Sequence, residues 1–208
     1  DCVGFGNIYG AFTASFTAAV ATDLGRQTVT VANNAGAFNI FDVFVRGTDF
    51  AWTNLGGKPP PLTVQWARGA DPAACPGSSC FTSRSNTIHV KSTAEDTDEF
   101  DDAVLGHEFG HFLENAFSRG DSPGGFHDGS PTDPRLAWSE GYGTYTGAEI
   151  FGTPYYVDTW ASGAARIDIS DSGYRANPAG GLQQRLPEAL VSELLWTLSH
   201  GGDLTDPL

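Results

Sequence analysis

The sequence predicts an α+β fold in which a mainly β half, residues 1–96, precedes a mainly helical half, residues 97–208. Strand signals dominate the first half and helical periodicity dominates the second, and no internal repeat or low-complexity tract interrupts either half. With 208 residues and 40% hydrophobic side chains, the chain is long enough to bury a core. It is also short enough to form a single domain over residues 1–208.

Three short stretches of the first half have strand character. Residues 28–31 (TVTV) and 87–92 (TIHVKS) alternate in polarity, and residues 62–66 (LTVQW) follow the stiff segment KPPP. One helix is expected among them, over residues 37–52, because polar residues recur there at three- and four-residue spacing and leave the other faces apolar. We expect this helix to pack on a twisted sheet built from the strands.

Three helices are expected in the second half. The first includes residues 103–117, AVLGHEFGHFLENAF, and the second covers residues 136–151, LAWSEGYGTYTGAEIF. The third covers residues 186–200, with Pro187 in its first turn and Gly201 just past its end. A long loop rich in Gly, Pro and Ser joins the first two helices.

An acidic run precedes the first of these helices. It consists of Asp98, Glu99, Asp101 and Asp102. Carboxylates at this place interact favourably with the positive end of a helix. Because carboxylates are also the ligands that Ca²⁺ prefers, the same run has a second interpretation as a structural calcium site.

Charge and hydropathy exclude two classes of function. The chain has 25 acidic and 11 basic residues, a net charge of −14, whereas binding to nucleic acid requires clustered Lys and Arg. No stretch of eighteen or more apolar residues occurs, so we expect no membrane span. Methionine is absent, and we therefore expect a processed chain or an excised domain from which a targeting segment has been removed.

Two of the three cysteines lie close together. Cys75 and Cys80 flank the turn-forming sequence PGSS, which can bring their sulfur atoms within bonding distance. A disulfide there predicts an oxidising compartment, and so a secreted or cell-surface protein; the alternative is a pair of free thiols. Cys2 is the odd cysteine, either free or paired with a residue of a removed segment.

The helix over residues 103–117 contains the motif His107-Glu108-x-x-His111. Residues four apart lie on one face of a helix, so the two imidazoles can chelate one ion. Zn²⁺ held by two imidazoles and a third protein ligand keeps a coordination position for water, and an adjacent carboxylate can take the proton from that water. Gly106 and Gly110 are unfavourable in a helix interior, which indicates that another element packs closely against them.

The third ligand must come from elsewhere in the chain. The metzincin continuation of the motif is absent, because Glu114 stands in place of its Gly and Phe117 in place of its third His. The best candidate is Glu140, in AWSEGYGTY, on a helix that glycines make approachable.

HEFGH followed by a separate helix that carries S-E-G resembles the gluzincin group of zinc metallopeptidases. The resemblance covers about residues 97–151. It implies that His107, His111 and Glu140 bind zinc and that Glu108 is the general base. It also implies a zincin-like fold with the active site in a cleft between the two halves, and a secreted endopeptidase whose partners are peptide or protein substrates.

Several other residues near the motif are open alternatives. His127, in GGFHDG, can replace Glu140 as a ligand or form a wall of the cleft, and Asp128 and Asp133 in the same loop are weaker candidates. Glu114 is either a hydrogen-bond acceptor behind a ligand or a solvated carboxylate. Glu149 lies nine residues after Glu140, which places it on nearly the opposite helix face and excludes it as a ligand.

A peptidase of this type also needs a hydrogen-bond donor for the oxyanion of its tetrahedral intermediate. Six side chains are candidates: Tyr142, Tyr145, Tyr155, Tyr156, Tyr174 and His200. We favour Tyr174, which lies in the glycine-containing loop SDSGYR.

Two further functions are compatible with the motif. One is a surface or adhesion domain stabilised by zinc without turnover, although such a site has no need of Glu108. The other is a zinc hydrolase that acts on a non-peptide acyl substrate, because the motif constrains the activation of water more than the group attacked.

Overall fold

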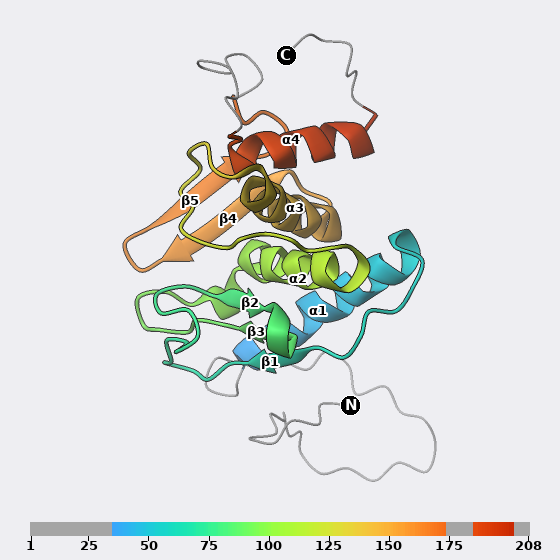
Figure 1. The fold of residues 1–208 in the computed structure, drawn as a ribbon. Helices are drawn as coiled ribbons and strands as arrows, with labels where there is room; N and C mark the ends of the chain where they lie inside the picture. Colours follow the sequence, from blue (N-terminus) through green and yellow to red (C-terminus); the bar gives the residue numbers. More distant parts are fainter. Residues whose placement is uncertain (1–34, 174–184, 202–208) are drawn as a thin grey trace.

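The computed structural model describes residues 35–173 and 185–201 and has a mixed α+β architecture (Figure 1). Its helices are α1 (Ala35–Asn54), α2 (Asp102–Phe117), α3 (Pro134–Phe151) and α4 (Glu188–Ser199). Its strands are β1 (Thr63–Gln65), β2 (Cys80–Thr82), β3 (Thr87–His89), β4 (Tyr155–Trp160) and β5 (Gly163–Asp168). Two short 3-10 turns, η2 (Ser83–Ser85) and η3 (Asp98–Phe100), complete the described part of the chain.

The first sheet is small and mixed, with strand order β1-β3-β2. β1 pairs in parallel with β3, β2 pairs antiparallel with β3, and Ile88 of β3 is the partner of both Val64 and Phe81. β1 and β3 fall within the predicted strands at 62–66 and 87–92, whereas β2 was not predicted. The predicted strand at 28–31 lies outside the described residues.

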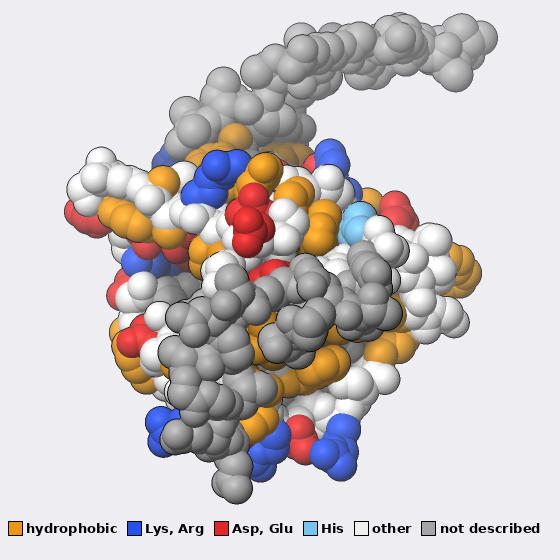
Figure 2. Space-filling view, turned by 90° about the horizontal axis from the view of Figure 1, so that it is seen from above, with side chains coloured by type: hydrophobic (Ala, Val, Ile, Leu, Met, Phe, Trp, Pro, Cys, Tyr) orange, Lys and Arg blue, Asp and Glu red, His pale blue; other side chains and the backbone are white. Residues whose placement is uncertain are grey.

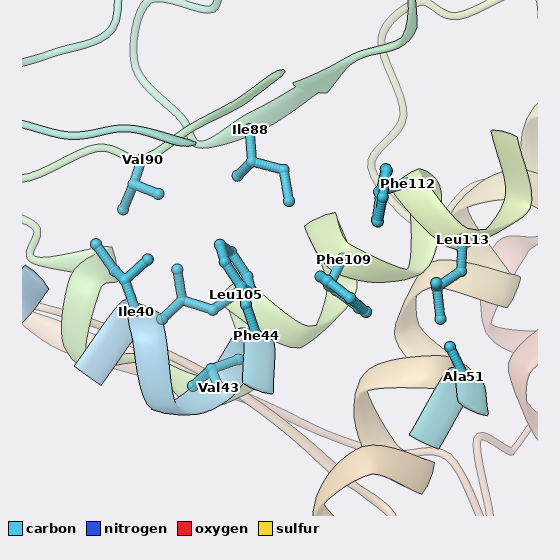
Figure 3. Packing of buried hydrophobic residues seen from close by; sticks show 10 residues of the cluster. All are labelled: Ile40, Val43, Phe44, Ala51, Ile88, Val90, Leu105, Phe109, Phe112 and Leu113. Atoms are coloured by element: carbon cyan, nitrogen blue, oxygen red, sulfur yellow. The ribbon is translucent and has the colours of Figure 1, made fainter. Parts of the chain in front are cut away.

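The core lies between this sheet, α1 and α2 (Figure 3). Its buried members are Ile40, Val43, Phe44, Ala51, Ile88, Val90, Leu105, Phe109, Phe112 and Leu113. Phe109 of α2 stacks on Phe44 of α1 with ring centroids 5.3 Å apart, and it packs edge-on against Phe112 at the same distance. α1 includes all of the helix predicted at 37–52. Its apolar positions recur at the helical period and face the core.

α2 is the central element of the described fold (Figure 1). α1 and the three-stranded sheet lie on one side of it, and α3 and β4 lie on the other. α4 packs on α3, as expected for the last predicted helix. Pro187 lies immediately before the first residue of α4, and Gly201 follows its end with φ of +71°.

The second half also contains a β-hairpin that the sequence did not predict. β4 and β5 pair antiparallel from Tyr155 and Asp168 to Trp160 and Gly163. Most of their residues are exposed or half-buried, so the alternation of polarity that identifies a strand is weak. The predicted helical half is therefore interrupted by two strands.

Glycines allow α2 and α3 to approach at backbone distance. A Cβ atom added to Gly110 lies 2.7 Å from Cα of Gly143, and one added to Gly106 lies 2.9 Å from Cα of Gly147. Both distances are shorter than any normal carbon contact, so neither position can hold a larger residue without separating the helices. The close packing expected from Gly106 and Gly110 is thus made by a glycine pair on α3.

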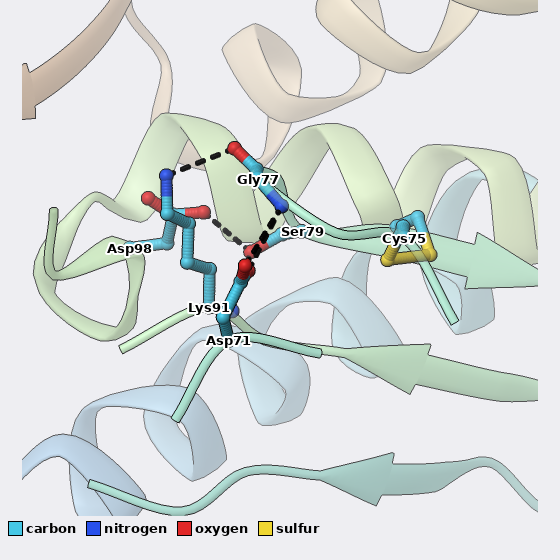
Figure 4. Close-up of a disulfide and its surroundings, with 7 residues drawn as sticks. Asp71, Cys75, Gly77, Ser79, Lys91 and Asp98 are labelled. Atoms are coloured by element: carbon cyan, nitrogen blue, oxygen red, sulfur yellow. Dashed lines mark hydrogen bonds between the residues drawn. A yellow bond between two sulfur atoms is a disulfide. The ribbon is translucent and has the colours of Figure 1, made fainter. Parts of the chain in front are cut away.

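The disulfide predicted in the first half is present between Cys75 and Cys80 (Figure 4). It closes the loop that precedes β2. Within this loop Gly77 has φ of +92°, and its N–H donates to both carboxylate oxygens of Asp71 at 2.9 and 3.1 Å. Cys2 lies outside the described residues.

Lys and Arg side chains are scattered over the described part of the face seen in Figure 2 rather than gathered in one patch. None of the described helices is long and apolar enough to cross a membrane.

We predict that Gly110→Ala destabilises the protein. Overpacking typically costs about 1–3 kcal/mol, and the better helix propensity of Ala returns up to about 1 kcal/mol of this. Urea denaturation should therefore show a loss of about 1–2 kcal/mol in the free energy of unfolding.

Gly57→Ala is the matched control, because a Cβ atom there meets only Phe117 at 3.7 Å, an ordinary contact. Equal stability of the two variants would contradict the close helix contact.

Candidate metal centre

The two motif histidines lie side by side on α2. The helical period places His107 and His111 one turn apart on the face toward α3, with ring centroids 4.6 Å apart and ring planes nearly perpendicular. Their Nε2 atoms lie 3.0 Å apart, and the side chains are only 12% and 15% exposed. The two nitrogens therefore converge on one point at the edge of the protein interior.

Glu140 of α3 reaches the same point. Its Oε2 atom lies 3.2 Å from Nε2 of His107 and 3.3 Å from Nε2 of His111. Ligand atoms of a tetrahedral zinc site with bonds of about 2.0–2.1 Å are roughly 3.3 Å apart, so one ion can contact all three atoms. The structure thus brings together the three predicted ligands as a group that can hold a metal ion.

Hydroxyl groups of α3 orient both imidazoles. Ser139 donates to Oε2 of Glu114 at 2.6 Å, so its oxygen accepts from Nδ1–H of His111 at 3.2 Å. Nδ1 of His107 lies 3.0 Å from Oγ1 of Thr144. With the proton on Nδ1, each Nε2 atom presents its lone pair to the metal position. These partners fit a metal centre, because ligating histidines usually donate from the other ring nitrogen.

Sequence reasoning missed Ser139 and Thr144 and left two roles open for Glu114. Glu114 is not a solvated carboxylate, since it is 7% exposed and accepts from Ser139, whose oxygen in turn contacts Nδ1 of His111. Ser139 immediately precedes Glu140, and Thr144 follows it by one helical turn. This spacing from Glu140 is the feature of the sequence from which both residues could have been predicted.

The electrostatics of the site favour a cation. Burial lowers the pKa of His111, but its hydrogen bond to Glu140 and the charges of Glu108, Glu140 and Glu114 together raise that pKa to about 9. Burial raises the pKa of Glu140, and hydrogen bonds to the two histidines more than reverse this and hold it well below its usual value. A metal ion at this position displaces the proton from His111, because imidazole binds metals in its neutral form.

Glu108 and Tyr156 lie beside this group. Glu108 is 7% exposed. The ring of Tyr156, on β4, is 6.0 Å from the ring of His107. Burial, with the negative charges of Asp158 and Glu108, raises the pKa of Tyr156 far above its usual value. Its hydroxyl therefore stays protonated and remains a hydrogen-bond donor.

His127 lies next to the group but does not complete it. Its Nε2 atom is 3.5 Å from Oε2 of Glu140, while its Nδ1 atom is 3.0 Å from Oε2 of Glu188 on α4. Among the described residues, the metal-holding group at this place has three members.

The remaining acidic candidates serve local structure. Asp128 accepts from the N–H and hydroxyl of Ser130 within its own loop. Asp133 precedes α3 and accepts from the N–H of Arg135, which caps the helix. Glu149 accepts from Ser199 of α4 at 2.5 Å, away from Glu140 as predicted.

Most of the other predicted oxyanion donors have different partners. Tyr155 packs under the guanidinium of Arg166, with 3.8 Å between Cζ and the ring centroid, and His200 stacks on Trp196. Tyr142 packs between Trp138 and Tyr145. Tyr174 lies outside the described residues, so its role stays a prediction.

Comparisons of the chain with protein-family models, with curated proteins and with solved structures found no match.

We predict that Thr144→Val weakens metal binding at this group, measured with Zn²⁺ as the probe, about 10–100-fold, the usual effect of removing the partner of a ligating histidine. Valine keeps the shape of threonine but leaves Nδ1 of His107 without the hydroxyl. The zinc affinity is measured by competition with a chromophoric chelator. Thr144→Ser is the control, because it retains the hydroxyl; equal affinities for the two variants would contradict the proposed orientation of His107.

Proposed function

We propose that this chain is the catalytic domain of a secreted zinc-dependent endopeptidase of the gluzincin type. The observation that carries the proposal is the group of His107, His111 and Glu140, with Nε2 and Oε2 atoms 3.0–3.3 Å apart and a buried glutamate beside it. Two imidazoles, one carboxylate and an open position for water are typical of catalytic zinc sites.

Each residue of the site has a separate role in the proposed peptide hydrolysis. His107, His111 and Glu140 would hold the zinc ion, which when bound would supply a Lewis acid for a substrate carbonyl and for a water that is acidic near neutral pH. Glu108 takes the proton from the attacking water and later passes it to the leaving amine. Tyr156 donates from its phenol to the oxyanion that forms on the scissile carbonyl. Thr144 and Ser139 hold the imidazoles in the required orientation.

A catalytic role explains this arrangement better than a structural one. A structural zinc site normally closes its fourth position with another protein group. Among the described residues, the group that could hold the ion consists of His107, His111 and Glu140 alone. Glu108 also has no purpose in a non-catalytic adhesion domain. A zinc hydrolase acting on a non-peptide acyl substrate uses the same residues, so the choice of substrates in the assay separates it from a peptidase.

The Cys75–Cys80 disulfide supports the proposed location, because such bonds persist in oxidising compartments outside the cytoplasm.

Glu108→Gln tests the proposed reaction. The variant should bind zinc as the parent does, since the ligands are unchanged, and should lose activity about 100-fold or more, the usual contribution of a general base. Activity is measured on casein and on internally quenched peptides with blocked termini, and zinc content is measured by mass spectrometry. Glu95→Gln, at an exposed position, is the matched control.

Cleavage of the peptides by Glu108→Gln at the parental rate would overturn the general-base assignment. Hydrolysis of acyl esters without cleavage of any peptide would support the non-peptide hydrolase instead. A zinc-loaded parent with no activity on either class would support the adhesion domain.

Tyr156→Phe tests the oxyanion donor separately. It removes the hydroxyl group and keeps the ring that packs near His107, so kcat should fall about 100-fold while zinc affinity stays constant. Steady-state kinetics on a quenched peptide measure the change, with Tyr155→Phe as the control on the same strand. An unchanged kcat would show that another residue donates to the oxyanion, and Tyr174 would be the next candidate.

A further inference from the structure

We propose that a second site, a carboxylate cluster at the start of α2, binds one Ca²⁺ ion. Its members are Asp96, Asp98, Asp101 and Asp158. They come from the loop after β3, from η3, from the residue before α2, and from β4. The site is independent of the proposed peptidase activity.

The positions of the carboxylate oxygens suit a shared ion. One oxygen from each of the four residues lies within 4.8 Å of the corresponding oxygens of the others. Calcium bonds its oxygen ligands at about 2.3–2.6 Å, so opposite ligands of one ion are about 4.8 Å apart. An all-oxygen donor set excludes zinc as the preferred ion. Four carboxylates favour calcium over magnesium, which usually keeps several waters and binds one or two carboxylates.

Two oxygens of the carboxylate cluster are buried and lack a hydrogen-bond donor. Oδ1 of Asp96 and Oδ1 of Asp158 are buried from solvent and have no hydrogen-bond partner. A buried carboxylate oxygen without a donor is unfavourable by about 1–3 kcal/mol or more, so it needs a cation or a proton. Both oxygens belong to residues that the shared group already brings together, which makes a bound cation the simplest partner.

Three of the four carboxylates also accept hydrogen bonds from protein donors. Ser79 donates to Oδ2 of Asp98 at 2.5 Å, and Nζ of Lys91 donates to Oδ2 of Asp96 at 2.7 Å. Thr159 donates to Asp101 from its N–H at 3.0 Å and its hydroxyl at 2.8 Å. These bonds orient the carboxylates as the outer partners of a metal site do.

The disulfide loop supplies one of these donors (Figure 4). Ser79 immediately precedes Cys80, and its oxygen also accepts from the N–H of Lys91 at 3.0 Å. Nζ of Lys91 donates to the carbonyl of Gly77 in the same loop at 2.9 Å. The disulfide thus holds the loop that positions Asp98.

The net charge of the carboxylate cluster is not balanced within it. Lys91 is the one cation that pairs directly with the cluster in the described part of the chain. The four carboxylates lie close enough to repel one another, and a divalent cation removes this repulsion.

The carboxylate cluster differs in its members from the acidic run that the sequence suggested as a calcium site. Asp98 and Asp101 of that run join the carboxylate cluster, whereas Glu99 accepts from Ser92 at 2.7 Å and Asp102 accepts from Asn39 of α1 at 2.8 Å. Asp158 lies 57 residues beyond Asp101, so no local sequence pattern includes it.

An ion at this place joins the β4–β5 hairpin to the start of the metal-binding helix. Asp101 immediately precedes α2, and Asp158 is two residues from Tyr156, whose ring packs near His107. Asp96 also forms a backbone bridge with Trp160 at the end of β4. Calcium is therefore expected to stabilise both the start of α2 and strand β4, the two elements that carry His107 and Tyr156.

The test uses the full chain, which is first freed of metal ions with EGTA, then separated from the chelator by desalting, and then loaded with zinc. Isothermal titration with CaCl₂ should give one binding event per chain, and CaCl₂ at about 10 mM should raise Tm by about 5 °C or more. MgCl₂ at the same concentration should give less than half of that rise. No heat of binding and a Tm independent of calcium would overturn the proposal.

Asp158→Asn distinguishes this site from weak binding to an acidic surface. It should lower calcium affinity at least tenfold and remove most of the calcium-dependent rise in Tm. Without calcium its Tm should equal or exceed that of the parent, because one repelling charge is gone. Asp49→Asn, which removes an exposed charge from α1, is the matched control and should keep the full response.

A calcium response that Asp158→Asn retains in full would place the ion elsewhere and refute the site. Because neither readout uses peptide hydrolysis, failure of the peptidase assay leaves this result unaffected.

Discussion

The rest of the structure depends on the backbone contact between α2 and α3. Four glycines, Gly106 and Gly110 facing Gly143 and Gly147, remove the side chains that would otherwise separate the two helices. Gly143 also leaves space for His107, whose ring atoms lie 3.1 Å from the place of a Cβ atom. Only at this separation can a glutamate of α3 reach two imidazoles of α2. Glycine is unfavourable in a helix, but at these positions it gives the helix spacing that determines the geometry of the candidate metal centre.

α2 also separates two environments within the described fold. Its face toward α1 and the sheet is apolar and holds Phe109, Phe112 and Leu113 in the core. Its face toward α3 is polar and buried, and there His107, His111 and Glu114 each have a partner from α3. Buried polar groups are tolerated when they are hydrogen-bonded, so the hydroxyls of Ser139 and Thr144 are as necessary to this face as the histidines.

The β4–β5 hairpin gives a structural connection between the two proposed metal sites. Tyr156 packs near His107, and Asp158, two residues along the same strand, joins the carboxylate cluster beside the first residue of α2. A strand places residues i and i+2 on one face, so both side chains project toward α2. In this arrangement, calcium binding and the position of the proposed oxyanion donor depend on the same strand.

The sequence by itself determined the features that rest on local periodicity and local motifs. These are the four helices, two strands of the first sheet, the Cys75–Cys80 disulfide and the His107-Glu108-x-x-His111 motif. Glu140 was also found, from its glycine-rich helix and its resemblance to a known ligand position. Only the tertiary structure revealed Ser139 and Thr144 as partners of the imidazoles, Tyr156 at the site, and Asp158 in the carboxylate cluster. Those roles depend on which faces of distant elements meet. The glycines of α2 and α3 determine how these two helices pack, and the β4–β5 hairpin determines where Tyr156 and Asp158 lie. The strands of this hairpin are largely exposed, so their sequences show little of the alternation in polarity that predicts a strand.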